Sequence, residues 1–133
     1  AARLMALAGA EVLIYPTAIG YAPEEKEDYP HQLQAWQTIQ RGHAVANALP
    51  VLAVNRVGFE PSPDRADSGL HFWGHSFAAG CQGEILAEAN DREDEVLVVD
   101  IDKGKTDRVR RVWPFLRDRR IDLYGDLLKR WRD

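Results

Sequence analysis

The stretch AARLMALAGAEVLIYPTA, residues 1–18, indicates a helix, a turn and a buried strand in immediate succession. Residues 1–8 are strong helix formers, and Gly9 stands where such a helix would stop. Residues 12–15 form a short apolar run closed by Pro16, which is typical of a strand covered on both faces. Because no usual capping residue precedes the helix, the chain is expected to begin inside it.

Helix and strand patterns alternate further along the chain. The sequence predicts a long helix over 31–49, because apolar residues recur there at intervals of three and four and Pro50 follows. A second buried strand is expected over 51–57, closed by Gly58, and a polar loop over 61–69. This order favours strands of one sheet that are joined through a covering helix.

The remaining segments add a hairpin, a strand and a helix. Residues 76–79 and 84–87 flank a Gly-Cys-Gln-Gly turn, which predicts a hairpin. A third apolar strand is expected over 95–101, and a short basic helix over 103–113. The fold class is therefore α/β, and strands this apolar are expected to expose a large hydrophobic surface when the chain stands alone.

Composition limits the function classes. The chain has 133 residues, of which 45% are hydrophobic and 29% charged, so it is expected to form about one globular domain. A net charge of −4 gives no overall attraction to nucleic acid or to an anionic membrane. No apolar run reaches the ~20 residues that span a bilayer. A single cysteine, Cys81, excludes an internal disulfide and suits the cytoplasm.

Five segments in a fixed order carry a family resemblance, and they read AARLMALAGAEVLIYPTAIG, WQTIQRGHAVANALPVLAVNRVG, FWGHSFAAGCQGEILAEA, EVLVVDID and RVRRVWPFLRDRRIDLYGDL. In these segments the chain resembles the carbon–nitrogen hydrolase (nitrilase) superfamily, and within it the N-carbamoylputrescine amidases. The resemblance implies the C-terminal half of a four-layer α-β-β-α sandwich. Residues 1–133 would then be the C-terminal portion of a single carbon–nitrogen hydrolase domain.

The resemblance also implies the chemistry of the parent enzyme. A glutamate takes the proton of a cysteine thiol, the thiolate attacks a carbamoyl carbon, and a lysine with a backbone N–H stabilises the oxyanion. Carbamoylputrescine would give putrescine, carbon dioxide and ammonia, with no cofactor and no metal. All three catalytic residues precede Ala1 in the family pattern, so no catalytic residue is expected in this chain.

Three consecutive residues are the best candidates for a substrate pocket. Thr17, Ala18 and Ile19 follow the carboxyl end of a buried strand, where α/β sheets tend to bind ligands, and this loop lines the pocket in the family. The alternative is simple loop closure. Asn55 lies in an apolar strand, where an unpaired amide would cost ~1–3 kcal/mol, so we expect it to bind a backbone group beside the site. The resemblance places His75 near the pocket mouth.

Other reactive side chains receive structural interpretations. Cys81 lies in the predicted hairpin turn, where a nucleophile would need a base within reach, so it is not expected to be a displaced catalytic cysteine. His71 and His75 are four apart, but their loop-like context and the lack of a third ligand disfavour a metal site. His43 is expected to be a partly buried residue of the long helix.

Clusters of charge leave further alternatives open. An acidic loop could attract a cationic amine but is more simply a solvated surface; it contains Glu24, Glu25, Glu27 and Asp28. A basic stretch could bind RNA, although interleaved aspartates favour packing and oligomer contacts; it contains Arg108, Arg110, Arg111, Arg117, Arg119 and Arg120. The expected partners are thus a small carbamoyl or amide substrate and other copies of the chain, with no nucleic acid or membrane. A β-ureidopropionase-like hydrolase and a catalytically empty interaction domain remain alternatives.

Overall fold

The structure, a computed structural model, describes residues 1–131, apart from the side chains of residues 65–67. The helices are α1 (Ala2–Leu7), α2 (Tyr29–Asn47) and α3 (Lys103–Val112), with 3-10 helices η1 (Pro23–Glu25) and η2 (Ile121–Leu128). The strands are β1 (Leu13–Pro16), β2 (Gly20–Tyr21), β3 (Val51–Val54), β4 (Val57–Ser62), β5 (Arg65–Trp73), β6 (Phe77–Ala79) and β7 (Ile85–Glu88). They form a main sheet in the order β1-β3-β6-β7 and a small sheet in the order β2-β5-β4.

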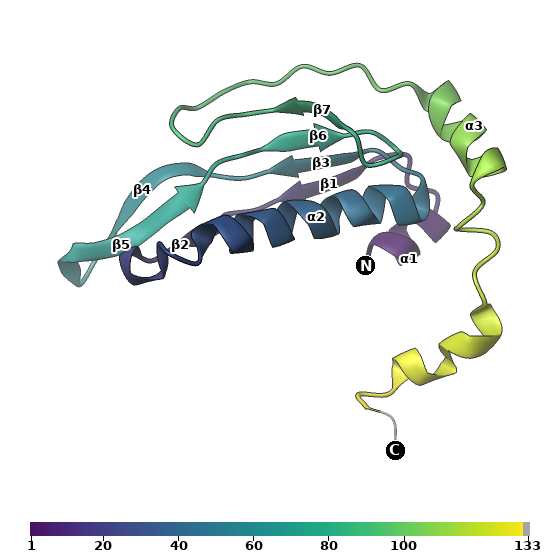
Figure 1. The fold of residues 1–133 in the computed structure, drawn as a ribbon, viewed down its shortest axis with the longest axis horizontal. Coiled ribbons are helices and arrows are strands. Elements are labelled where there is room, and N and C mark those ends of the chain that lie inside the picture. The colour runs from purple at the N-terminus through teal and green to yellow at the C-terminus, as the bar shows by residue number, and fades with distance from the viewer. Residues whose placement is uncertain (132–133) are drawn as a thin grey trace.

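The two sheets meet at the carboxyl ends of β1 and β3. These two strands are parallel, because α2 crosses between them along one face of the main sheet (Figure 1). β6 and β7 add to the other side of β3 as antiparallel strands. β4 follows β3 and β5 leads into β6, so the small sheet extends from the end of the main sheet where β1 and β3 finish.

The core lies between the main sheet, α2 and α1. Leu13 of β1, Val51 of β3 and Leu49 are completely buried, and Ala2 and Ala6 of α1 pack against them. Each large side chain of this kind contributes about 1.5–3 kcal/mol by leaving water. This cluster holds the amino ends of β1 and β3 in place and so fixes where their carboxyl ends emerge.

The opposite face of the main sheet is open among the described residues. Ile14 pairs in register with Leu52, and Pro16 with Val54, on the side away from α2. The exposed fraction is 56% for Ile14 and 50% for Val54, whereas Leu13 and Val51 on the helix side have none. The expected exposure of apolar strand surface is confirmed, and this face is a surface that favours contact with another apolar layer.

Most of the predicted elements are confirmed. Helix α1, strand β1, the β6–β7 hairpin and helix α3 all lie within one or two residues of the predicted bounds. Gly9 ends α1 with φ +94°, a left-handed conformation that glycine adopts without steric cost. Helix α2 begins and ends two residues earlier than predicted, because Ala48 adopts the left-handed conformation at φ 46° and stops it before Pro50.

Two predictions around the second sheet were wrong. The single strand expected over 51–57 is interrupted after Val54, because Asn55 turns its side chain to the backbone of neighbouring loops. The loop expected over 61–69 is the hairpin of β4 and β5, and Pro61 is tolerated because β4 is an edge strand. The polar residues over 61–69 suggested a loop, but they lie in a hairpin that projects from the main sheet (Figure 1).

The third apolar strand, expected over 95–101, is also wrong for the described structure. Residues 95–101 run in an extended path beyond β7 but form no ladder with a described strand. Val96 and Val98 are each 90% exposed. The alternating pattern is that of a strand, but a strand also requires a neighbour to accept its backbone hydrogen bonds.

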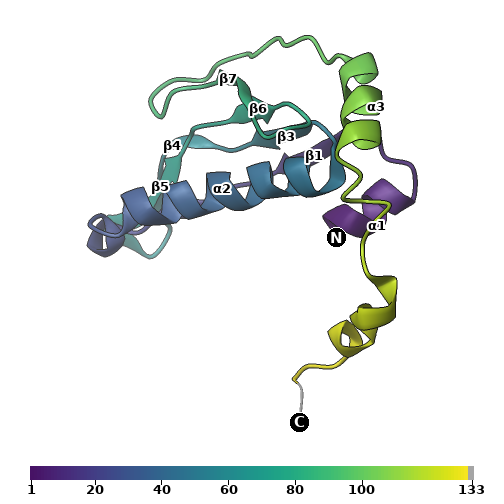
Figure 2. The same cartoon turned by 45° about the vertical axis from the view of Figure 1, so that its right-hand side comes forward.

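The C-terminal segment stands away from the sheets. Beyond α3 the chain passes through Trp113 and Phe115 to η2, which lies apart from the body in two views (Figures 1 and 2). The exposed large side chains of this segment are Ile121, Leu123, Leu127, Leu128 and Trp131. Among the described helices, none combines the length and the apolar character needed to cross a membrane.

Candidate functional site

Asn55 is the centre of the candidate site, at the point where β3 ends. Its side-chain oxygen accepts hydrogen bonds from the backbone N–H of Ile19, at 2.8 Å, and from the hydroxyl of Thr17, at 3.1 Å. Its Nδ2 donates to the carbonyls of Ile19, at 3.0 Å, and Gly74, at 3.1 Å. Only 9% of Asn55 is exposed, so one buried amide ties together two loops that are distant in sequence. The prediction that the Asn55 amide binds backbone groups is confirmed, whereas its place beside a substrate site stays a prediction.

Thr17 secures the beginning of the same loop. Its backbone N–H donates to the carbonyl of Val54 at 2.7 Å, and its hydroxyl also lies 2.9 Å from that oxygen. The single hydroxyl proton serves either Val54 or Asn55 at one time. Ala18 is exposed between these two anchored residues. These bonds anchor the 17–19 loop at the carboxyl edge of the main sheet.

Two residues of the site escaped the sequence-based reasoning. Ser76 Oγ accepts from the N–H of Asn55 at 2.9 Å and donates to its carbonyl at 3.1 Å, which continues the pairing of β3 and β6 beyond the ladder. Gly74 has φ +62°, and a Cβ there would lie 2.6 Å from the carbonyl of Asn90. The only sequence signal was a glycine inside FWGHSF, which does not indicate what approaches it.

His75 lies next to Gly74 but points away from Asn55. Its own φ is +52°, and its N–H donates to the carbonyl of Asn90 at 3.2 Å. Its Nδ1 lies 3.0 Å from a carboxylate oxygen of Glu88, which also accepts from Gln37 at 2.7 Å. The ring therefore joins the 74–76 turn to β7 and α2, and it supports the loop without facing the amide of Asn55.

A cleft of about 520 Å³ opens beside this cluster, and we call it the Asn55 cleft. Its lining residues are Val54, Asn55, Arg56, Val57, Gly74, Ser76, Ala89, Asn90, Glu93, Asp94 and Glu95. Of the five predicted site residues only Asn55 lines it, and Thr17, Ala18, Ile19 and His75 do not. The Arg56 guanidinium lies 4.1 Å above the ring of Phe72 and pairs with Glu60, so its charge is already partly satisfied.

Cys81 lies far from the Asn55 cleft. Ala79 pairs with Val51 at the amino end of β3, and Cys81 follows it, so the thiol lies at the opposite end of the main sheet from Asn55. Cys81 is 97% buried, with 3% exposed. Near it, burial opposes the charge of Glu84, but hydrogen bonds from Lys105 and from backbone N–H groups hold the pKa of Glu84 below its usual range. Among residues 1–131, no three metal-binding side chains gather.

Three of the six arginines of the basic stretch pair with aspartates. Arg117 Nε lies 2.6 Å from Asp118, and Arg120 Nε donates to Asp122 at 2.8 Å. In the preceding helix, Arg108 lies 3.1 Å from Asp102, whose side chain also accepts from the N–H of Lys105 at the start of α3. These pairs balance part of the positive charge of the stretch within the chain itself.

The parallel pairing of β1 with β3, covered on one face by α2, defines an α/β protein, and its loop cluster lies at the carboxyl ends of these strands. The model of the carbon–nitrogen hydrolase family matches residues 1–111. The chain is 46% identical to an N-carbamoylputrescine amidase of Solanum tuberosum over 96% of its own length, and 40% identical to a citrullinase of Francisella tularensis over 98%.

A crystal structure of a carbon–nitrogen hydrolase from Helicobacter pylori G27 superposes with a TM-score of 0.93 at 56% identity, over 98% of this chain and 45% of that one. The chain belongs to the carbon–nitrogen hydrolase family. It spans 42% of the length of the Solanum amidase and 44% of that of the citrullinase. The family relationship expected from the five sequence segments is confirmed.

Proposed function

We propose that residues 1–133 form the C-terminal portion of a single carbon–nitrogen hydrolase domain that hydrolyses the carbamoyl group of N-carbamoylputrescine. The observation that carries the proposal is the 46% identity to an N-carbamoylputrescine amidase over nearly the whole chain. Identity at this level supports a shared reaction more strongly than a shared fold alone, because function depends on the site.

In this proposal the chain supplies the wall of the pocket. Thr17, Ala18 and Ile19 do not line the Asn55 cleft of this chain, and in the complete domain they would face the substrate. Asn55 holds this loop through its bonds to the Thr17 hydroxyl and to the Ile19 backbone. His75 supports the adjoining turn through Glu88. The catalytic groups come from the part of the family domain that this chain does not span. They are the reacting thiol, its glutamate base and the oxyanion-binding lysine. Rigid walls of this kind help catalysis because they hold the reacting carbon in one position.

The reaction itself needs no metal or organic cofactor. A thiolate attacks the carbamoyl carbon, and the proton from the thiol accompanies ammonia as it leaves. Water then attacks the carbamoyl-enzyme, and the carbamic acid so formed breaks down to the amine and carbon dioxide. For N-carbamoylputrescine the amine is putrescine, so the enzyme would serve polyamine synthesis in the cytoplasm.

A second substrate is favoured by a specific observation, the 40% identity to a citrullinase. Citrulline and N-carbamoylputrescine both carry a ureido group on an aliphatic chain with an ammonium group further along, and citrulline has a carboxylate on the same carbon as its ammonium group. Carbamoyl-β-alanine, the substrate of a β-ureidopropionase, has a terminal carboxylate and no ammonium group. A catalytically empty interaction domain would need none of these ligands.

We propose in addition that the chain assembles into a homo-oligomer. The open face of the main sheet and the exposed side chains of η2 provide apolar surface that favours association. The ion-paired arginines of the C-terminal segment favour a role in protein contacts over one in binding nucleic acid.

The test expresses the longest reading frame that contains this chain and measures ammonia release from N-carbamoylputrescine, citrulline and carbamoyl-β-alanine. The expected result is turnover of the first or second substrate, loss of turnover after a thiol reagent, and no turnover by residues 1–133 alone. Preference for carbamoyl-β-alanine would favour the β-ureidopropionase alternative. An inactive full-length protein that binds no ureido compound would contradict the enzyme proposal.

A further inference from the structure

A second cleft lies beyond the Asn55 cleft, where the small sheet meets the start of α2. Its volume is about 370 Å³. Its lining residues are Tyr21, Tyr29, Gly58, Phe59, His71, Phe72 and Asp91, and we call it the aromatic cleft. None of its lining residues belongs to the Asn55 cleft, so the two sites can be perturbed separately.

The floor of the aromatic cleft is a row of rings across all three strands of the small sheet. Tyr21 of β2 and Phe59 of β4 both pair in register with His71 of β5, which places the three side chains on one face. The ring centroids of Tyr21 and His71 lie 5.4 Å apart in a stacked arrangement, and those of Phe59 and His71 lie 4.6 Å apart. Tyr29 adds a ring from α2, 4.7 Å from Tyr21.

This row is more exposed than an aromatic core would be. Phe59 is 47% exposed, and His71 is also exposed, whereas Trp73, two residues further along the same strand, is buried. Tyr29 is 5.9 Å from Trp73 by ring centroid, so the buried rings support the cleft from behind. Tyr21 and His71 stack on one another, so Phe59 provides the most accessible aromatic surface of the row.

A carboxylate completes the cleft. Asp91 follows the turn that packs against Gly74. Burial raises the pKa of Tyr29, and the negative charge of Asp91 raises it further, which agrees with a carboxylate beside the phenol. Among the described side chains, Arg92 pairs with Asp91 at 3.7 Å, and 86% of the Arg92 side chain is exposed. A pair this long and this exposed contributes little, so a ligand cation can replace it.

We propose that the aromatic cleft binds the ammonium end of an aliphatic amine. Ring faces attract a cation through their quadrupole, and a neighbouring carboxylate adds a charge of the opposite sign. The methylene chain of such an amine would lie against the same rings, whereas a carboxylate-ended ligand would meet Asp91 and be repelled. The ammonium can belong to a ureido substrate or to a free diamine, and the test distinguishes the two sources.

The first arm uses the longest reading frame that contains this chain, because residues 1–133 alone are expected to self-associate through their exposed apolar surface. Tyrosine and tryptophan fluorescence, or amide NMR shifts, would follow titration with putrescine, n-butylamine and the neutral probe 1-butanol. Both amines are expected to bind and to shift residues of the aromatic cleft, whereas 1-butanol is not. Equal shifts from 1-butanol, or amine binding that leaves these residues unchanged, would overturn the proposal.

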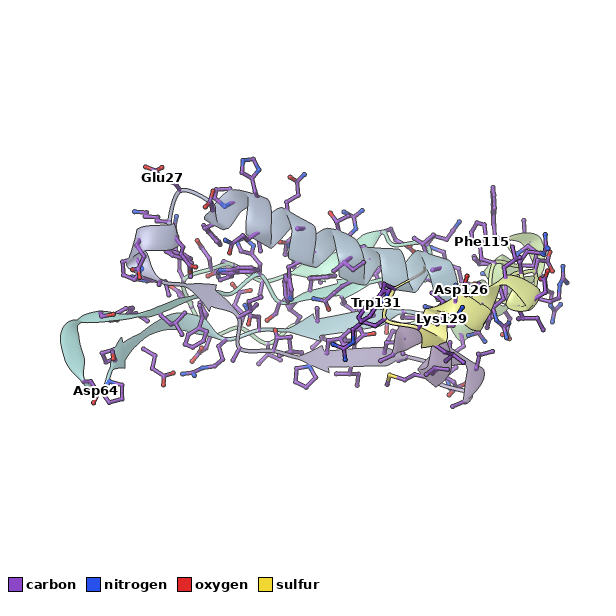
Figure 3. All side chains as sticks on the ribbon, turned by 90° about the horizontal axis from the view of Figure 1, so that it is seen from below. Glu27, Asp64, Phe115, Asp126, Lys129 and Trp131 are labelled. Carbon is purple, nitrogen blue, oxygen red and sulfur yellow. The ribbon has the colours of Figure 1, made fainter. Side chains whose placement is uncertain are left out.

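Two variants and a matched control identify the groups involved. Asp91→Asn is expected to weaken putrescine binding about three- to fivefold, the range of an exposed ion pair. Phe59→Leu removes one ring face and is expected to weaken it by about the same factor. Asp64→Asn removes a carboxylate at the far tip of the β4–β5 hairpin (Figure 3) and is expected to leave binding unchanged. Equal loss in Asp91→Asn and Asp64→Asn would show only a general charge effect and would refute the site.

The second arm uses the longest reading frame and separates the two sources of ammonium. If the cleft takes the substrate, Asp91→Asn raises KM for N-carbamoylputrescine and leaves KM for neutral n-butylurea unchanged. If it takes a free diamine, Asp91→Asn instead raises the putrescine concentration that is needed to change the rate about three- to fivefold. An inactive enzyme would count against the proposed hydrolase, while the binding result of the first arm would still decide the aromatic cleft.

Discussion

Replacing Asn55 by alanine is the sharpest test of how the candidate pocket wall is held. The amide makes two bonds to the backbone of Ile19, one to the carbonyl of Gly74 and a shared one to the hydroxyl of Thr17. In Asn55→Ala the carbonyl of Ile19 still accepts from Trp73, at 3.1 Å, but the N–H of Ile19 and the carbonyl of Gly74 lose these partners. The variant therefore removes bonds and leaves polar groups unpaired near a buried position.

The expected cost follows from these bonds. Three full hydrogen bonds at ~1 kcal/mol each, with a further ~1 kcal/mol for groups left without a partner, give a loss of about 3–4 kcal/mol in the free energy of unfolding. A domain of this size has only ~5–15 kcal/mol in total, so the loss would be plain. Thr17→Val removes a single shared hydroxyl bond and is expected to cost only about 0.5–1.5 kcal/mol.

The assay is equilibrium urea unfolding together with amide hydrogen exchange of Ile19. Asn90→Ala is a matched control, because Asn90 is also an asparagine that accepts from backbone N–H groups, of Arg92 and Glu93, but it lies exposed. We expect Asn55→Ala to lower the unfolding free energy far more than the control and to speed exchange at Ile19. Equal losses for the two asparagines, or unchanged exchange at Ile19, would refute the reasoning.

Three further predictions concern the rest of the fold. Gly20→Ala places a Cβ 2.3 Å from the carbonyl of His71, so it should push β2 away from β5 and lower the midpoint of thermal unfolding. Gly42→Ala, in α2 with open space around it, should instead stabilise the chain by ~0.5–1 kcal/mol. Equal effects of the two substitutions would contradict this. Because the pKa of Glu84 is lowered in the folded chain, its charge stabilises the fold above pH 4.5, and this contribution is lost as the pH falls through the lower folded-state pKa. Glu84→Gln should therefore reduce the loss of unfolding free energy between neutral and acidic pH. An equal loss in the variant and the unchanged chain would count against the Lys105 pair. Light scattering of residues 1–133 should show self-association that Ile14→Lys with Val54→Lys reduces, while the same change at already polar Glu27 does not; monodisperse monomers of the unchanged chain would be the opposite outcome.

Local patterns were sufficient to predict the elements of the main sheet and its helix. Each of these patterns favours one local conformation strongly. They are Gly9, the apolar run of β1 and the glycines of the β6–β7 turn, and all lie where predicted. The errors concern segments whose state depends on a neighbour. The polar residues of β4 are compatible with a loop or with an edge strand, and pairing with β5 decides between them.

The sequence also predicted only part of the candidate site. Asn55 could be singled out because a buried amide must find partners, and its partners include the predicted loop at Ile19. Its other contacts, Gly74 and Ser76, come from a turn that is remote in sequence. No local rule indicates that turn, because its geometry rests on left-handed φ angles at Gly74 and His75. The cluster as a whole is a property of the tertiary structure.

The open face of the main sheet and the extended segment 95–101 both expose apolar side chains. Val54 on the open face and Val96 beside β7 are apolar side chains at positions that strand patterns normally bury. Both would be satisfied by further packed layers or by strand neighbours, which the proposed sandwich and oligomer would provide. The bonds of Asn55 do not depend on this cover, since each joins residues of the chain itself. The pocket wall that we propose for Thr17 and Ile19 therefore rests on hydrogen bonds within this chain, and a covering layer is not needed to make them.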